Sequence, residues 1–302
     1  MLRRVLLVVL AFVLVGTGTA TAVPRVIEGK APQLHPEGVA WDQSRHAFLV
    51  GSAVHGTVSV VRPSGEVGTL AKVPLPHQVS TLGLKVDARR GRVLVTYANM
   101  LSEEVRSGLA IFDLRDGRPL HVVDLAIGAG PHRANDVTVD RAGNAYVTDP
   151  VSDAIYRVGV DGRAEVYARD ARLGQFGNNG IAWHPSGYLV VGHYANGKLF
   201  RVTRDEVDEI ALEQPLVGAD GIAFRPDGAL LVVTNSLASQ GRNAVTVLRI
   251  AGGQAHVVRE KAWPTTSPTT VTVTPHGAYV VTGYLDKLLA GTPVDDFRLD
   301  RL

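Results

Sequence analysis

An internal repeat constrains the fold of this chain more than any other feature of its sequence. Four related segments begin with an oxygen-bearing side chain and continue into a short apolar run: Glu37-Gly38-Val39-Ala40-Trp41-Asp42, Asn135-Asp136-Val137-Thr138-Val139-Asp140, Asn179-Gly180-Ile181-Ala182-Trp183-His184 and Asp220-Gly221-Ile222-Ala223-Phe224-Arg225. Two weaker copies begin at Leu82 and Thr269. The six starts are 45, 53, 44, 41 and 49 residues apart. This spacing is typical of four-stranded propeller blades.

Each strong copy has the pattern of a β-hairpin. A short apolar strand is followed by a turn such as His184-Pro185-Ser186-Gly187, and then by a second strand. Gly accepts positive φ and Pro presets the turn. Third and fourth strands follow in most copies, as at Ala154–Val158 and Ala164–Ala168. Because no segment longer than about ten residues has a helical period, the sequence predicts an all-β fold.

We therefore predict a six-bladed β-propeller with four antiparallel strands per blade, in a single domain over residues 23–302. The last copy is short. Its outer strands must come from Tyr284–Ala290, Phe297–Leu302 or the N-terminal Val26–Lys30. Pairing one chain end into the last blade would close the ring and cover a sheet edge.

Residues 1–22 have the pattern of a secretory signal peptide. Arg3 and Arg4 precede the apolar run Val5–Val15, and Ala20-Thr21-Ala22 is a predicted cleavage site. The run is shorter than the roughly 20 residues that span a bilayer, and a retained anchor is the alternative. The sequence thus predicts a protein that is secreted or held in the periplasm or cell envelope, with no membrane span after cleavage after Ala22.

The composition excludes several classes of protein. Removing residues 1–22 leaves 29 basic and 29 acidic residues, so no polybasic surface for nucleic acid is indicated. The chain has no Cys and therefore no disulfide. No Gly-x-Ser-x-Gly elbow, phosphate-binding loop or dinucleotide fingerprint occurs. We expect a monomer that acts on a small molecule and binds no nucleic acid.

The four oxygen-bearing starts, Glu37, Asn135, Asn179 and Asp220, are called the oxygen quartet below. In a closed ring they converge on the axis, where two carboxylates about 4 Å apart would repel by about 4 kcal/mol at an effective dielectric of about 20. A cation bound between the carboxylates would replace this repulsion with attraction. Oxygen ligands and the absence of Cys favour calcium over zinc, and roughly six to eight ligands around calcium leave positions open for water or substrate. The alternative is that the quartet holds no cation and only forms hydrogen bonds at the mouth of the channel, with water filling the remaining space.

These copies resemble the calcium-dependent six-bladed propeller superfamily of the SMP-30/gluconolactonases (LRE-like), paraoxonases and the phosphotriesterase that cleaves diisopropyl fluorophosphate. The resemblance is strongest over Glu37–Val61, Ala134–Val158, Asn178–Val202 and Ala219–Asn235. It implies that Glu37, Asn179 and Asp220 are metal ligands. It also implies that Asn135 is a ligand or holds substrate or water, and that Arg133 contacts substrate. The chain departs from the SMP-30 pattern at Pro36-Glu37-Gly38-Val39, where Gly-Glu-Gly-Pro is usual, and at Leu231-Val232-Val233, where the family carries a tryptophan.

We therefore expect a calcium-dependent hydrolase of a lactone or related ester, with organophosphate hydrolysis as a side activity of the same site. Asp220 is expected to be a ligand and the general base, and Arg133 and His193 to orient the substrate. His132 is a second rim histidine that could transfer protons or bind substrate. The competing hypothesis is a non-catalytic exported propeller that binds a glycan, peptide or protein, with a purely structural calcium.

Overall fold

The computed structural model describes residues 23–100 and 106–302. The predicted signal peptide, residues 1–22, lies outside the described residues, as do residues 101–105. Strands dominate the fold, as predicted. The helical elements described are α1 (Leu285–Leu289) and the 3₁₀ turns Ala88–Arg90 and Ala171–Leu173. Among the described residues, no helix has the length and apolarity needed to cross a bilayer.

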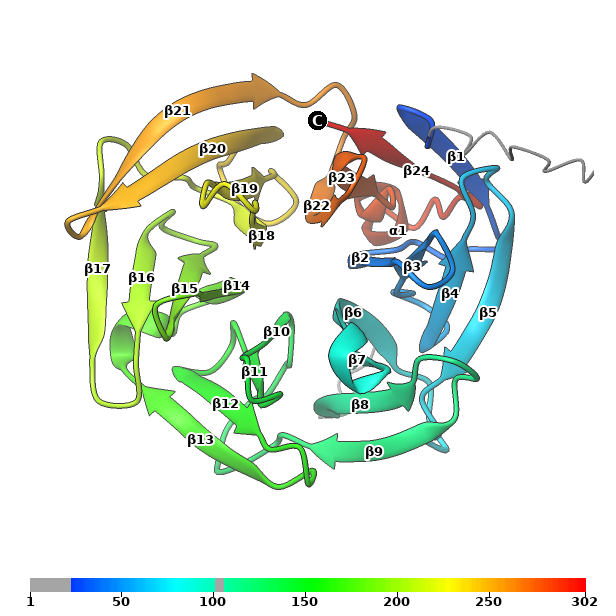
Figure 1. Ribbon diagram of the computed structural model, residues 1–302, viewed down its shortest axis with the longest axis horizontal. Helices are drawn as coiled ribbons and strands as arrows, with labels where there is room; N and C mark the ends of the chain where they lie inside the picture. Colours follow the sequence, from blue (N-terminus) through cyan, green and yellow to red (C-terminus); the bar gives the residue numbers. More distant parts are fainter. Residues whose placement is uncertain (1–22, 101–105) are drawn as a thin grey trace, which may run out of the picture.

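The first three sheets each contain four consecutive antiparallel strands. Their strands are β2 (Val39–Asp42), β3 (Ala47–Val50), β4 (Thr57–Val61) and β5 (Val67–Lys72); β6 (Ser80–Asp87), β7 (Arg92–Ala98), β8 (Ser107–Asp113) and β9 (Pro119–Asp124); and β10 (Val137–Val139), β11 (Ala145–Thr148), β12 (Ala154–Val158) and β13 (Ala164–Arg169). The first strand of each sheet lies at the centre of the molecule and the last at its periphery (Figure 1).

The next sheet has eight strands and joins two such units. One unit is β14 (Asn178–His184), β15 (Tyr188–His193), β16 (Leu199–Val202) and β17 (Val207–Leu212); the other is β18 (Ala219–Phe224), β19 (Leu230–Thr234), β20 (Ala244–Ala251) and β21 (Gln254–Ala262). A short parallel pairing at the rim, Ala211 with Gln254 and Leu212 with Ala255, joins β17 to β21. The described strands thus form five sheets, so the count of six blades stays a prediction.

The fifth sheet combines both ends of the described chain. It contains β22 (Pro268–Thr274), β23 (Gly277–Thr282), β24 (Asp296–Arg301) and β1 (Val26–Lys30). The register pairs Val26 with Asp300 and Lys30 with Asp296. This confirms that a chain end completes the last sheet, and it closes the ring seen in Figure 1.

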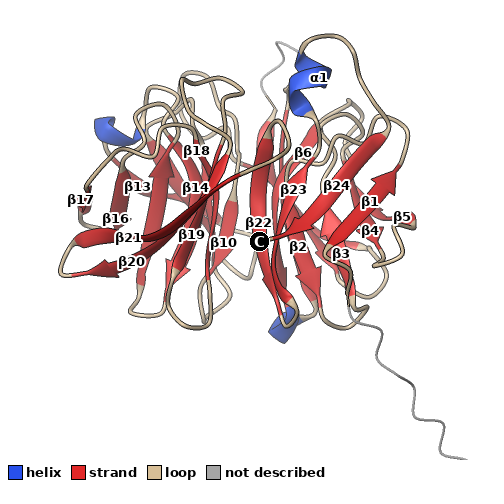
Figure 2. Cartoon of the chain, turned by 90° about the horizontal axis from the view of Figure 1, so that it is seen from above, coloured by secondary structure: helices blue, strands red, loops and turns tan. Residues whose placement is uncertain are grey.

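The segment Tyr284–Ala290, one of three candidates for an outer strand, is not a strand. Leu285–Leu289 forms α1 on one face of the ring (Figure 2). Leu285 is the buried residue of this helix, and Ser267 Oγ donates a 2.7 Å hydrogen bond to the Asp286 carboxylate. Because β24 and β1 already fill the outer positions of the last sheet, this segment is left to cover the face.

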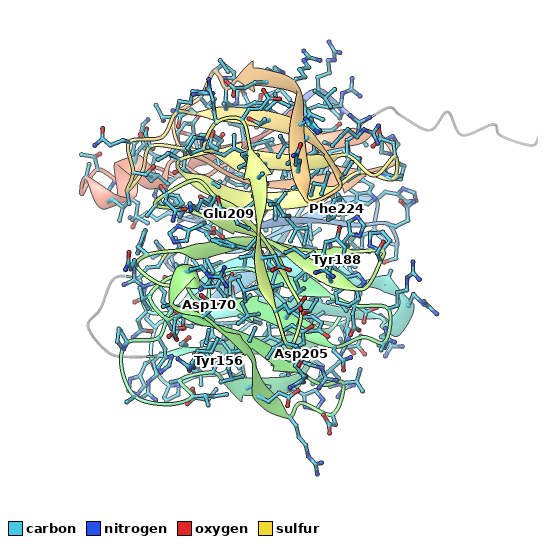
Figure 3. All side chains as sticks on the ribbon, turned by 90° about the vertical axis from the view of Figure 1, so that its left-hand side faces the viewer. Tyr156, Asp170, Tyr188, Asp205, Glu209 and Phe224 are labelled. Carbon is cyan, nitrogen blue, oxygen red and sulfur yellow. The ribbon has the colours of Figure 1, made fainter. Side chains whose placement is uncertain are left out.

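Apolar side chains fill the spaces between neighbouring sheets. Phe48 of β3 and Tyr279 of β23 pack with ring centroids 4.9 Å apart, which joins the first sheet to the last. The outer strands carry charge instead: on β17, Glu209 lies at the periphery (Figure 3) and its carboxylate accepts a 2.7 Å bond from Lys198 Nζ. The core is therefore a ring of inter-sheet layers around a central channel.

Candidate metal and active site

Hydrogen bonds to the backbone carbonyls of three quartet residues join neighbouring sheets near the channel. Thr269 Oγ1 donates a 2.5 Å hydrogen bond to the Glu37 carbonyl, and Thr148 Oγ1 donates one of 2.5 Å to the Asn179 carbonyl. The Gly83 N–H donates to the Asn135 carbonyl at 2.9 Å. Segments from distant parts of the sequence are thereby brought together around the axis.

The glycine that follows three of the four quartet residues makes this close approach possible. A Cβ on Gly180 would overlap the carbonyl oxygen of Asp220, and one on Gly38 would overlap that of Leu82. At both positions the backbone of the next strand occupies the space that a side chain would need. The Glu-Gly, Asn-Gly and Asp-Gly pairs of the repeat thus combine a polar side chain with close strand packing.

Three of the quartet oxygens are buried and lack a hydrogen-bond partner among the described residues: Glu37 Oε2, Asn135 Oδ1 and Asn179 Oδ1. Glu37 and Asn179 are each 6% exposed and Asp220 5%. Asn135 is half-buried. An unsatisfied buried oxygen costs free energy, so three together at one level indicate a missing electropositive partner.

The two carboxylates of the quartet are destabilised as anions. Burial raises the pKa of Glu37 well above its ordinary value, and the charges of Asp220 and Asp136 raise it further. Burial raises the pKa of Asp220 to about 8; the Asn235 hydrogen bond opposes this shift and the charge of Asp136 adds to it. A divalent cation between the two carboxylates would remove this cost.

Asp220 is held by a chain of buried hydrogen bonds. Asn235 Nδ2 donates to Asp220 Oδ2 at 2.6 Å and to the Pro268 carbonyl at 2.9 Å. Tyr194 Oη donates to Asn235 Oδ1 at 2.6 Å and accepts from the Ala238 N–H at 3.1 Å. One carboxylate oxygen is therefore fixed by the protein, which orients the other.

The donor set suits a hard cation. Within the described residues, no group of three His, Cys, Asp or Glu side chains could hold a metal ion. A cation at the quartet would therefore depend on the amide oxygens of Asn135 and Asn179 as well as on the two carboxylates. Oxygen-only sets of this kind are typical of calcium rather than zinc.

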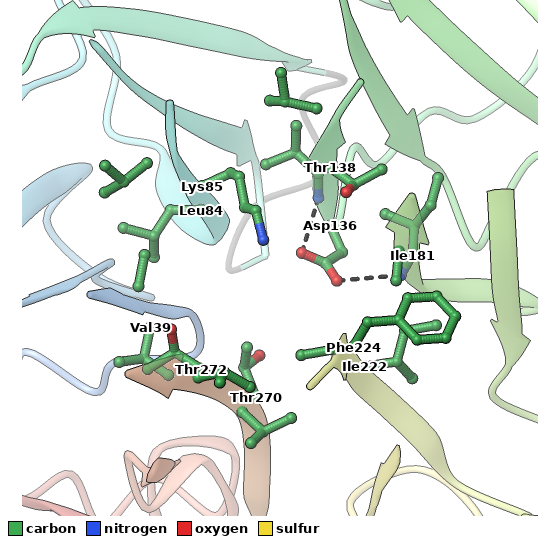
Figure 4. Close-up of a pocket in the computed structure, with 18 of the residues that line it drawn as sticks. Val39, Leu84, Lys85, Asp136, Thr138, Ile181, Ile222, Phe224, Thr270 and Thr272 are labelled. Carbon is green, nitrogen blue, oxygen red and sulfur yellow. Dashed lines mark hydrogen bonds between the residues drawn. The ribbon is translucent and has the colours of Figure 1, made fainter. Parts of the chain in front are cut away.

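A separate cavity of about 370 Å³ lies further along the inner strands and is not lined by the quartet. Lys85 and Asp136 project into it from β6 and from the start of β10 (Figure 4). Asp136 accepts hydrogen bonds from the Val137 and Ile181 N–H groups at 2.8 and 3.3 Å. Lys85 meets solvent in the cavity, yet the surrounding protein lowers its ammonium pKa, an effect that the charge of Asp136 opposes. The sequence repeat contained a signal for this pair. Asp136 stands where most copies have Gly, and Lys85 stands where the other copies have a small residue, Ala or Thr.

The structure places the two predicted substrate contacts differently. The half-buried Arg133 side chain makes no hydrogen bond or ion pair with a described residue. By contrast, both ring nitrogens of the buried His193 are engaged: Nε2 with the Gly174 carbonyl at 3.1 Å and Nδ1 with the Asn196 N–H at 3.3 Å. Burial lowers the pKa of His193. Arg133 is thus available to a ligand, whereas His193 ties two loop segments together.

Together, the fold and the site define an all-β propeller-like protein with an oxygen-rich centre on its axis. Residues 35–282 match the family described as SMP-30/Gluconolactonase/LRE-like region, and the chain belongs to that family. The match confirms the resemblance inferred from the repeat. No curated protein sequence matches the chain.

Several solved structures share the fold. The allergen Mala s 1 of Malassezia sympodialis is 19% identical with a TM-score of 0.71, over 92% of this chain and 96% of the other. A catalytically inactive virginiamycin B lyase of Staphylococcus aureus with quinupristin is 14% identical, with a TM-score of 0.65 over 92% and 99%. A luciferin-regenerating enzyme is 17% identical, with a TM-score of 0.61 over 92% and 96%. At these identities the likeness shows the fold alone.

Proposed function

We propose that this protein is an exported calcium-dependent hydrolase that acts on a lactone or a related ester. The observation that carries the proposal is the group of unpartnered buried oxygens of Glu37, Asn135 and Asn179 beside the raised-pKa carboxyl of Asp220. Family membership supports it, since gluconolactonase is among the activities for which the family is named.

In this proposal, Glu37, Asn135, Asn179 and Asp220 hold the cation. When bound, calcium polarises the substrate carbonyl or lowers the pKa of a bound water. Asp220 accepts a proton from the attacking water, and Asn235 keeps its carboxylate oriented for this transfer. The guanidinium of Arg133, which pairs with no described residue, stabilises the negative charge that develops on the carbonyl oxygen. His193 shapes the rim through its contacts with Gly174 and Asn196.

The test is a turnover screen with lactones and aryl esters, run with calcium and with excess EDTA. We expect hydrolysis that requires calcium and is lost in Asp220→Asn and Glu37→Gln. An Arg133→Met variant should keep calcium binding and lose turnover. Hydrolysis that persists in EDTA would contradict the mechanism. Calcium binding without turnover of any substrate would instead favour a non-catalytic propeller with a structural cation.

Two further features belong to the same proposal. Counting the eight-stranded sheet as two blades joined at the rim gives a propeller of six blades, each with its innermost strand at the channel.

The basic, apolar and small-residue sequence of residues 1–22 supports export with cleavage after Ala22. N-terminal sequencing of protein secreted by an expressing cell tests the second point: Val23 as the first residue is the expected result.

A further inference from the structure

A buried imidazole and carboxylate lie between two of the proposed cation ligands. His132 Nδ1 lies 3.5 Å from Asp149 Oδ2 and 3.0 Å from the Tyr156 hydroxyl oxygen. The His132 side chain is 4% exposed and the Asp149 side chain is 0% exposed. Polar groups this well shielded from water interact more strongly than the same groups at the surface.

The backbone ties this pair to the quartet. The Asn135 N–H donates to the carbonyl of Thr148, the residue before Asp149, at 2.9 Å. The Asp149 N–H donates to Asn178 Oδ1 at 2.7 Å, and Asn178 directly precedes Asn179. Because His132 is only three residues before Asn135, the imidazole and the carboxylate flank the site from one side.

Asp149 is held so that one of its carboxyl oxygens faces His132. Asp149 Oδ1 accepts from the Val151 and Ser152 N–H groups at 3.2 and 3.3 Å, which holds the carboxylate in place. Its other oxygen, Oδ2, has no hydrogen-bond partner among the described residues and faces His132. Nδ1 is therefore the ring nitrogen that faces Asp149, and it also lies within hydrogen-bond distance of the Tyr156 hydroxyl.

His132 Nε2 is the atom left over. It is buried and has no hydrogen-bond partner among the described residues. It lies on the other side of the ring from Nδ1, and so faces away from Tyr156 and the apolar cluster in which Tyr156 is packed. Nε2 is therefore the ring nitrogen that no described protein group occupies.

From this geometry we propose that His132 is the general acid of the site and that Asp149 is its positioning residue. The inference rests on the proposed hydrolase function. As water adds to the carbonyl carbon, Asp220 takes the water proton and the carbonyl electron pair moves to its oxygen. When that pair returns, the carbon–oxygen bond to the leaving group breaks and His132 Nε2–H protonates the departing oxygen. The products are an acid and an alcohol, joined in one hydroxy acid for a lactone. Asp220 then loses its proton to solvent and His132 regains one.

The experiment compares leaving groups in the calcium-loaded full chain. An alkyl ester or a lactone needs its leaving oxygen protonated, whereas a 4-nitrophenyl ester does not. We expect His132→Gln to lower kcat for the lactone by roughly 10²-fold, the usual contribution of general acid catalysis, with little change for the nitrophenyl ester. Asp149→Asn should likewise lower kcat for the lactone more than for the nitrophenyl ester. His256→Gln, at an exposed position on β21, is the matched control and should leave both rates unchanged.

The outcomes separate the two proposals. Calcium affinity, measured by calorimetry, should be the same in His132→Gln as in the wild type. Equal losses for both substrates, or a loss of calcium binding, would show that His132 is structural and overturn the inference while the hydrolase proposal stands. A wild-type protein that hydrolyses neither substrate overturns both. Recovery of lactone turnover in His132→Gly on addition of imidazole would support the assignment, because a structural defect is not repaired in that way.

Discussion

The side-chain amide of Asn235, which directly follows β19, donates a 2.6 Å hydrogen bond to the carboxylate of Asp220 on the neighbouring strand β18. Both are buried, and Asn235 is itself fixed by Tyr194 and by the Pro268 carbonyl. The proposed ligand is thus oriented by residues that would not touch the cation. Such outer contacts determine ligand direction and basicity at metal sites.

Asn235→Leu should therefore weaken calcium binding without removing a ligand. Leucine is close in size but cannot donate to Asp220, so the carboxylate loses its orientation. We expect a loss of roughly 10- to 100-fold in calcium affinity by calorimetry. Tyr194→Phe removes only the next bond in the chain and should have a smaller effect. Unchanged affinity in Asn235→Leu would show that the hydrogen bond does not position Asp220 for the cation.

Cation binding should strengthen as pH rises. The pKa of Asp220 is about 8 and that of Glu37 is also raised, so at neutral pH the site must release protons when a cation binds. Calcium affinity should fall as pH decreases below about 8, and binding at pH about 7 should release protons that calorimetry in buffers of different ionisation enthalpy can count. Glu37→Gln should reduce the number released. A pH-independent affinity would contradict protonation of the site.

Without a cation, the protein should be less stable at pH about 9 than at pH about 5. The pKa of Asp220 is raised from 3.8 to about 8, so the folded state holds the proton more tightly than the unfolded chain. That contribution is complete below pH 3.8 and is lost as pH rises through about 8. Thermal melts in EDTA should show the midpoint falling over this range, and Asp220→Asn should flatten the dependence. Calcium should oppose the fall, since it replaces the proton. A wild-type midpoint that rises with pH contradicts the prediction.

Gly180→Ala should destabilise the fold, since a Cβ there overlaps the Asp220 carbonyl oxygen. We expect about 1–3 kcal/mol from the forced separation of β14 and β18, together with weaker calcium binding. Gly68 on the outer strand β5 is the control, because nothing lies within 4 Å of an added Cβ. Gly68→Ala should change stability by less than about 1 kcal/mol. Urea unfolding of both variants measures the difference, and equal effects would disprove the role assigned to the close approach of the inner strands.

Much of this architecture could be predicted because it depends on local patterns. The hairpin turns, the alternation of apolar strands and the spacing of the six copies are each visible over short stretches. The strand Ala154–Val158, for example, was predicted with the bounds that the structure has. The last sheet was harder, because three segments competed for two outer positions. Pairing of Val26–Lys30 with β24 decided it, and α1 formed from the segment left over.

The amino-acid sequence by itself determined the repeat, the all-β fold and the polar residue followed by glycine at the start of three inner strands. Only the tertiary structure decided which polar side chains meet: Asn235 with Asp220, Asp149 with His132, and Lys85 near Asp136. The physical reason is that a repeat fixes each copy by contacts between neighbours in sequence. The partners of a buried charge depend instead on which strands and connections fold against one another in three dimensions.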